Sequence, residues 1–167
     1  MRWLYAATSP ERNVLFGPHH CDEVRREVIL PWWNVYSFFC NLARVDDFQP
    51  LVHTASDRER SLLDRWILSD LHKLIGVANE SYSRFDVGRF CAEAARFIDV
   101  LSTWYVRRSR RRFYGDGWPA DKRAAYSTLY EVLTTFNRLI APIVPFLSET
   151  VYQNLVAKQG GDAPASV

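Results

Sequence analysis

The chain has 167 residues and a net charge of +2, with 24% charged and 48% hydrophobic residues. Such a length and composition fit one globular domain with a real core and room at most for a second small lobe, and they exclude a disordered chain. No apolar run is long enough to span a bilayer and there is no signal peptide, so we expect a cytoplasmic chain with no membrane partner.

Residues 1–20 read as an irregular lead-in. Arg2–Thr8 could form one or two helical turns, and the Ser9-Pro10 and Gly17-Pro18 pairs then break the backbone. The pair His19-His20 could suggest a metal, but adjacent side chains on a helix or strand point apart and the sequence places no third ligand beside them. We therefore expect no metal site.

The first long helix is predicted from about 22 to 44, because apolar residues recur there at helical spacing. Pro31 lacks a backbone donor and clashes with the carbonyl four residues back, so we expect a kink or a split at that position. Residues 45–58 form a polar connector in which Asp46 and Asp47 are expected to be solvated loop acids.

Two further helices follow, at about 59–84 and 87–112. The first carries a broad apolar stripe that begins at Leu62 and includes Trp66, and Gly76 inside it is tolerated at a cost of up to ~1 kcal/mol. Asp86 looks like the cap of the second helix, whose core face consists of Val87, Phe90, Cys91, Ala94, Phe97, Ile98, Leu101 and Tyr105.

Gly115, Gly117 and Pro119 end that helix in a turn, and Asp121 can cap the next one at about 122–141. A fifth helix starts at Pro145 and runs to about 158, and residues 159–167 are expected to be a flexible tail or linker. No β pattern competes, so the sequence predicts an all-α five-helix bundle spanning residues 21–158.

The three cysteines, Cys21, Cys40 and Cys91, lie far apart in apolar helical patterns without a C-x-x-C pair. They are expected to be buried free thiols in a reducing compartment. The chain contains no glycine-rich phosphate loop, H-E-x-x-H or G-x-S-x-G pattern, so no catalytic residue or ATP site is predicted.

The positive charge of the chain is local. Between residues 104 and 123, seven basic residues face two acids, a balance of +5, so the remaining residues sum to −3. Five of the seven are arginines at positions 107, 108, 110, 111 and 112, and eighteen arginines against three lysines occur overall. Arginine forks suit phosphate and base contacts, although a GC-rich genome would produce the same bias.

On a helix, Trp104, Arg108, Arg111 and Arg112 share one face, and Arg107, Arg110 and Tyr114 lie round from it. A planar aromatic beside a basic ridge favours contacts with phosphates and with unstacked bases. The alternative is a solvated helix end whose arginines pair with acids of neighbouring helices. Trp118, in a glycine-rich turn, either packs back on the protein or meets a ligand.

Five segments resemble, in order, the helical anticodon-arm-binding domain of class I isoleucyl-tRNA synthetases. They are PWWNVYSFF (the family's L-W-N-V-Y-x-F-F), LDRWILSDLHKLI, WYVRRSRRRFY, DKRAAYSTLYEVL and RLIAPIVPFLSETVYQNLV. The lead-in, MRWLYAATSPERNVLFG within residues 1–20, resembles the segment that follows the catalytic core in these enzymes. D-R-W-I and A-P-x-x-P-F are shared with valyl and leucyl relatives, whereas W-N-V-Y and R-R-S-R-R-R-F favour the isoleucyl family.

The resemblance implies a domain that docks on the anticodon stem-loop of tRNA-Ile and has no DNA partner. The RNA-binding candidates are Trp104, Arg107, Arg108, Arg110, Arg111, Arg112, Trp118, Lys122, Arg123 and Asn34. The chain lacks the H-I-G-H and K-M-S-K-S signatures with which the family binds ATP and Mg, so it should be inactive without the catalytic domain of the same synthetase. We therefore expect an excised piece, a truncated reading frame or a stand-alone relic. A protein-interaction bundle and a non-functional gene fragment are the alternatives.

Overall fold

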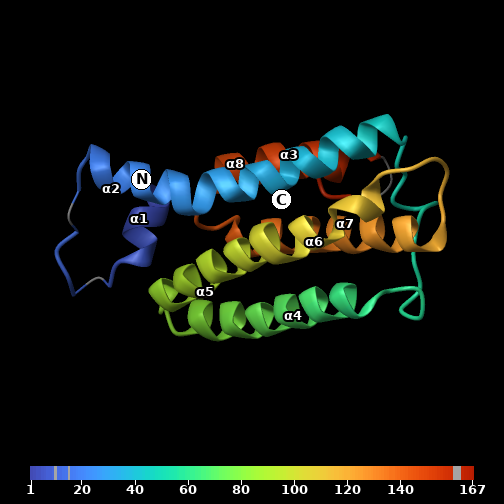
Figure 1. Cartoon of the computed structure of the whole chain (residues 1–167). Helices are drawn as coiled ribbons and strands as arrows, with labels where there is room; N and C mark the ends of the chain where they lie inside the picture. The colour runs from blue at the N-terminus through green and yellow to red at the C-terminus, as the bar shows by residue number, and fades with distance from the viewer. Residues whose placement is uncertain (10, 15, 160–162) are drawn as a thin grey trace.

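A computed structural model describes residues 1–9, 11–14, 16–159 and 163–167. In these residues the regular structure is helical and no strand occurs, which confirms the all-α class (Figure 1). None of the described helices is both long and apolar enough to cross a bilayer. The proline of the predicted break at Ser9-Pro10, and the Gly160-Gly161 part of the predicted tail, lie outside the described residues.

The first long helix begins earlier than predicted. After the short α1 (Arg2–Ala7), helix α2 (Pro18–Val24) continues through a π-helical turn, Arg25–Ile29, into α3 (Leu30–Val45). The Leu30 amide donates to the Arg25 carbonyl, five residues back, directly before Pro31. Because the wider π turn accommodates the proline ring and its missing donor, the disturbance expected at Pro31 takes the form of a π turn and the helix is not split.

Helix α4 (Leu62–Ser83) begins with a capping box. The Ser61 Oγ accepts from the Asp64 amide at 3.2 Å, and the Asp64 carboxylate accepts from the Ser61 amide at 2.9 Å. The apolar stripe predicted for this helix was wrong at its start, where Leu62 and Trp66 are 78% and 43% exposed and Asp64 is fully buried. At the start of α4 the Asp64 side chain therefore faces the core, because its carboxylate has hydrogen-bond partners there.

Helix α5 (Val87–Asp99) is capped as predicted, because the Asp86 carboxylate accepts from the Arg89 amide at 3.4 Å. The helical path then continues without a break to Phe113. It passes through a π-helical turn (Val100–Val106), α6 (Arg107–Ser109) and a 3₁₀ turn (Arg110–Phe113). The predicted core face is buried throughout, apart from the half-buried Val87.

Helix α7 (Ala120–Ile140) has Pro119 at its N-cap position, so the prediction that Asp121 caps it was wrong. The Asp121 carboxylate instead pairs with Arg112. Helix α8 (Pro145–Leu155) starts at its predicted proline and is followed by a 3₁₀ turn, Ala157–Gln159. Beyond it, the Tyr152 hydroxyl donates to the Pro164 carbonyl at 2.6 Å. The flexibility of the tail stays a prediction.

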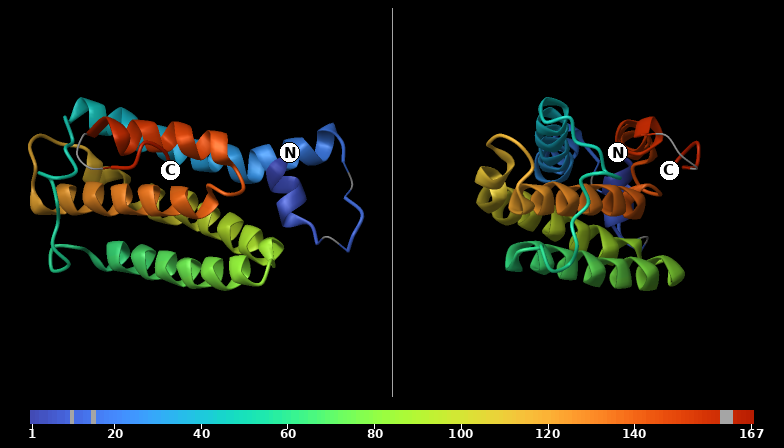
Figure 2. Two further views of the ribbon diagram at one scale, coloured as in Figure 1. Left: turned by 180° about the vertical axis from the view of Figure 1, so that it is seen from behind. Right: turned by 90° about the vertical axis from the view of Figure 1, so that its right-hand side faces the viewer.

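The long helices pack in three tiers. Helices α3 and α8 form one outer tier, the α5–α6 segment and α7 form the middle, and α4 forms the other outer tier (Figures 1 and 2). Aromatic rings from three helices meet at the centre, where Phe136 of α7 lies 4.8 Å from Trp32 and 5.4 Å from Phe97, centroid to centroid. The connector 46–61 and the 114–119 turn lie together at the end of the bundle where α6 ends.

Candidate nucleic-acid interface

Residues 104–113, which we refer to as the basic segment, lie on a helix whose inner side is fixed by four buried residues. Leu101, Tyr105, Ser109 and Phe113 are each at most 1% exposed and recur every four residues. In a regular α-helix of 3.6 residues per turn, this spacing would drift by about 40° at each step. The π turn at 100–106 offsets the drift, so the four side chains stay on the core side and the intervening residues face outward.

Four of the five arginines are exposed: Arg107, Arg108, Arg110 and Arg111. We refer to these four residues as the arginine ridge. None of them forms an ion pair with a carboxylate anywhere in the described part of the chain. The alternative that these arginines neutralise acids of neighbouring helices therefore does not describe the arginine ridge.

Aromatic rings alternate with the ridge guanidinium groups. The Arg108 Cζ lies 4.1 Å from the centroid of the Trp104 ring, which is 51% exposed. The Arg110 Nε donates to the Tyr114 hydroxyl at 3.1 Å, and its Cζ lies 5.9 Å from the Phe38 ring of α3. Exposed planar groups beside unpaired cations can stack on bases while the cations meet phosphates.

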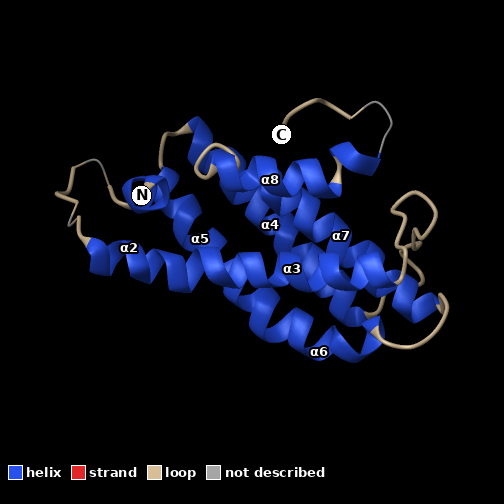
Figure 3. Ribbon diagram, turned by 90° about the horizontal axis from the view of Figure 1, so that it is seen from above, coloured by secondary structure: helices blue, strands red, loops and turns tan. Residues whose placement is uncertain are grey.

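Asn34 is exposed on α3, one helical turn before Phe38. Phe38 packs edge-on against Phe113 with ring centroids 5.3 Å apart, which ties that side of α3 to the end of the basic segment. Seen from above, α3 and α6 lie next to one another (Figure 3). The structure therefore places Asn34 on the same side of the bundle as the arginine ridge.

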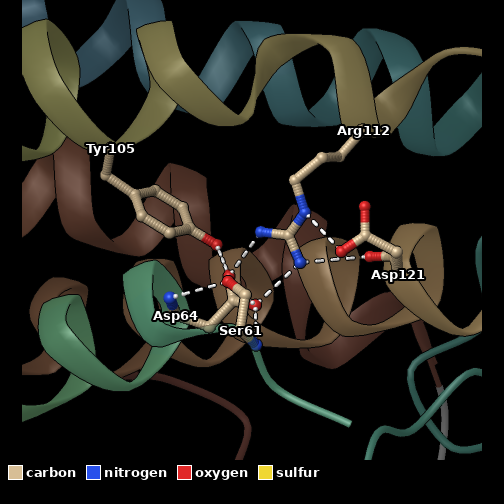
Figure 4. Close-up of polar contacts among 5 residues, drawn as sticks. All are labelled: Ser61, Asp64, Tyr105, Arg112 and Asp121. Atoms are coloured by element: carbon tan, nitrogen blue, oxygen red, sulfur yellow. Dashed lines mark hydrogen bonds and ion pairs between the residues drawn. The ribbon is translucent and has the colours of Figure 1, made fainter.

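The Arg112 side chain points into the protein, unlike the side chains of the other four arginines. Its side chain is 14% exposed, and its Nη1 and Nη2 donate to the two oxygens of Asp64 at 2.7 Å each (Figure 4). Its Nε donates to the Asp121 carboxylate at 2.9 Å. The sequence placed Arg112 on one face with Trp104, which was wrong, because the 3₁₀ turn and the buried acid direct its guanidinium inward. This geometry argues against a phosphate contact.

Lys122 and Trp118 also point into the protein. The Lys122 side chain is 2% exposed, and its ammonium donates to Asp46 at 2.8 Å and to the Gly115 carbonyl at 2.7 Å. The Trp118 ring stacks on the His53 ring with centroids 3.8 Å apart. Asp46 also accepts from the Tyr126 hydroxyl, so it is a structural acid and not the solvated acid expected. These contacts join the 46–61 connector to the 114–119 turn.

Arg123 is partly exposed and pairs with Glu59 of the connector, so it is committed to a protein contact. The pKa of Glu59 is lowered to about 2, first because the Ser56 amide donates to it at 2.8 Å and then because Arg123 does. The structure thus brings Trp104, the arginine ridge and Asn34 to one side of the bundle. It directs Arg112, Lys122 and Trp118 inward and pairs the partly exposed Arg123 with Glu59.

The histidine pair has a neighbour that the sequence reading overlooked. Ligand atoms of His19, His20 and Glu23 lie within 4.8 Å of one another, and His19 contacts Glu23 at 3.4 Å. The premise that no third ligand stands nearby was therefore wrong, and the absence of a metal site stays a prediction. The three cysteines are free thiols. Only Cys91 is fully buried, and burial raises its pKa to about 12.

Sequence reasoning missed two groups of residues at this site. Phe38 extends its aromatic surface, yet its contacts depend on how α3 packs on the basic segment. Tyr114, which helical spacing places near Arg107 and Arg110, was not among the candidates, although Arg110 donates to its hydroxyl. Asp64 and Tyr105 anchor the segment from inside. A signal for Asp64 was present, because Ser61 and an acid three residues later form a capping-box pattern.

Known proteins resemble the chain over its whole length. Residues 64–167 match the family described as the anticodon-binding domain of tRNA ligase. The chain is 41% identical to isoleucine–tRNA ligase of Clostridium novyi, 42% identical to that of Thermobifida fusca and 40% identical to that of Dehalococcoides mccartyi. The matches cover 99–100% of this chain but only 16% of each relative. The chain belongs to the anticodon-binding domain family of tRNA ligases.

Proposed function

We propose that this chain binds the anticodon arm of tRNA-Ile through the arginine ridge, Trp104 and Asn34. One observation carries the proposal: in a member of an anticodon-binding family, four adjacent exposed arginines have no carboxylate partner in the described structure, and aromatic rings alternate with them. The ridge contributes +4 to a chain of net charge +2, so the positive field is concentrated where a polyanion would bind.

The proposed role is to hold the RNA in position. The ridge arginines neutralise phosphates of the stem-loop, and Trp104 offers an aromatic face to an unstacked base. Since the family's ATP-binding signatures are missing from this sequence, ligation of isoleucine would need a catalytic domain of the same synthetase, with its ATP and Mg. Free thiols at all three cysteines support a reducing, cytoplasmic location.

The experiment measures binding of a tRNA-Ile transcript by fluorescence anisotropy over a series of salt concentrations. A variant with all four ridge arginines changed to alanine should bind more weakly, and its plot of log affinity against log salt should be flatter by about 3, from about 0.7–0.9 per lost contact. Trp104→Ala should weaken binding by about 1–3 kcal/mol if a base stacks there.

The chain offers a control with the same change in charge. Arg25, Arg26, Arg84 and Arg89 are exposed and each pairs with an acid, so replacing all four with alanine also removes +4. Equal losses of tRNA affinity in the two quadruple variants would contradict the proposal. A DNA hairpin of the same sequence and a non-cognate tRNA test the RNA and isoleucine specificity. Capture of an acidic protein with indifference to tRNA would favour the interaction-bundle alternative.

A further inference from the structure

One buried carboxylate beneath the arginine ridge accepts hydrogen bonds from three residues. Asp64 is fully buried at the start of α4, and both of its oxygens accept from Arg112 at 2.7 Å. Its Oδ1 also accepts from the Tyr105 hydroxyl at 2.8 Å, and its Oδ2 accepts from the Ser61 amide at 2.9 Å and hydroxyl at 2.8 Å (Figure 4). We refer to Ser61, Asp64, Tyr105 and Arg112 as the Asp64 network.

The Asp64 network holds the arginine ridge at both ends. Tyr105 lies two residues before the ridge in sequence and Arg112 directly after it, and both are bound to the same side chain. Arg112 also donates to the Asp121 carboxylate at 2.9 Å and to its backbone carbonyl at 3.2 Å, which ties the same point to the start of α7. Residues 106–111 therefore form a short helical arc whose two ends are fixed to one point of the core.

A buried carboxylate persists only when its oxygens are satisfied, and losing one partner leaves a charge without compensation. Here the two hydroxyls, the amide and the guanidinium satisfy Asp64, so the arrangement has one preferred geometry. That geometry determines the direction and spacing of the four guanidinium groups above it. Four of the five Arg112 N–H groups already donate to Asp64 and Asp121, so at most one N–H, on Nη1, is left for an RNA phosphate.

We propose that Asp64 and Arg112 are positioning residues for tRNA binding: they fix the arginine ridge in register with the phosphates and do not bind RNA themselves. The inference rests on the proposed function. It predicts a change in tRNA affinity that is opposite in sign to the change expected from charge alone. Asp64→Asn removes a negative charge below the ridge, so the charge change alone would strengthen binding of a polyanion, whereas loss of positioning would weaken it.

The test measures tRNA-Ile affinity and its salt dependence for Asp64→Asn and Arg112→Lys. We expect both variants to bind about tenfold more weakly, with a salt slope flatter by about 1, because fewer ridge arginines reach phosphates together. Lysine keeps the charge of Arg112 but cannot form the two-pronged contact with Asp64. If Arg112 were an ordinary phosphate contact, Arg112→Lys would retain most of the affinity.

Asp70→Asn provides the matched control. Asp70 also accepts a two-pronged contact from an arginine, Arg96, at 3.1–3.2 Å, but this pair joins α4 to α5 away from the ridge. The control should bind tRNA as the unmodified chain does. Unchanged or tighter binding by Asp64→Asn, or an equal loss in Asp70→Asn, would overturn the inference.

The ridge variant separates this inference from the proposed function. If replacing the four ridge arginines behaves no differently from its charge-matched control, the proposed function itself fails. If the ridge variant loses affinity while Asp64→Asn does not, only the positioning role fails. Circular dichroism establishes that each variant is folded at the assay temperature. Should Asp64→Asn not fold, Tyr105→Phe removes one donor only, and it must show a smaller loss of the same kind for the inference to survive.

Discussion

At the scale of single residues, Arg111 and Arg112 show how neighbours in one basic run take different roles. Arg111 is exposed and has no acidic partner in the described structure, whereas Arg112 is held by Asp64 and Asp121. Burial alone would disfavour the charged guanidinium, but Asp64 more than compensates, so the pKa of Arg112 is raised. Charge composition cannot distinguish these roles, because it counts both residues equally.

The ionisation of Asp64 should appear in the pH dependence of stability. Burial opposes the charged form, but hydrogen bonds from Arg112, Tyr105 and Ser61 outweigh it and hold the pKa of Asp64 below its ordinary 3.8. The stabilisation is therefore complete above that value and is lost as the pH falls through the lower folded-state pKa. We expect Asp64→Asn to cost about 3 kcal/mol of unfolding free energy at neutral pH.

This difference should shrink once the pH falls below 3.8, because the unmodified chain then loses its own carboxylate charge. Urea denaturation of both proteins, from about pH 7 to about pH 2, measures the difference. Asp99→Asn, at an exposed aspartate of α5, controls for the general effect of the substitution. A stability gap that stays constant over the whole range would contradict the assignment.

At the scale of elements, two π turns decide how the long helices meet. The turn at Arg25–Ile29 lets one helix continue through Pro31, and the turn at Val100–Val106 keeps Tyr105 facing Asp64 and the ridge facing outward. Both turns occur where the local sequence alone predicts a plain helix or a break. The first turn accommodates Pro31, and the second keeps the buried side chains from Leu101 to Phe113 on the core side.

Gly76 tests the helical propensity of α4 separately from its packing. It is exposed, and a methyl group added there would meet no atom within 4 Å. We expect Gly76→Ala to raise the unfolding free energy by about 1 kcal/mol in urea denaturation without altering tRNA affinity. Gly117 has a φ of +70°, so Gly117→Ala should lower stability instead. If Gly76→Ala did not raise the unfolding free energy, the backbone entropy of α4 would not be what limits the stability of this helix.

At the scale of the whole molecule, one hydrophobic cluster extends from α1 to α8. It includes Trp3 of the lead-in, which is 4% exposed, and Val151 and Leu155 of α8. Because each long helix contributes to the same cluster, the arginine ridge is carried by a single body and not by a loosely attached arm.

A shared core predicts cooperative unfolding. Far-ultraviolet circular dichroism and tryptophan fluorescence should give coincident urea transitions. The fluorescence difference between the unmodified chain and Trp3→Phe isolates the lead-in, because Trp3 packs against the cluster. An earlier transition of that difference signal would mean that residues 1–20 open separately from the bundle.

The five long helices, the Asp86 cap, the core face of α5 and the position of the basic segment could all be predicted from the sequence. These features follow from spacing and capping within a few residues, which a linear reading contains. Packing between distant segments turns Arg112, Lys122 and Trp118 inward, whereas Arg107, Arg108, Arg110 and Arg111 have no acidic partner among the described residues. The physical reason is distance along the chain: Arg112 meets a partner 48 residues away and Lys122 one 76 residues away, and helix packing alone brings those acids within reach.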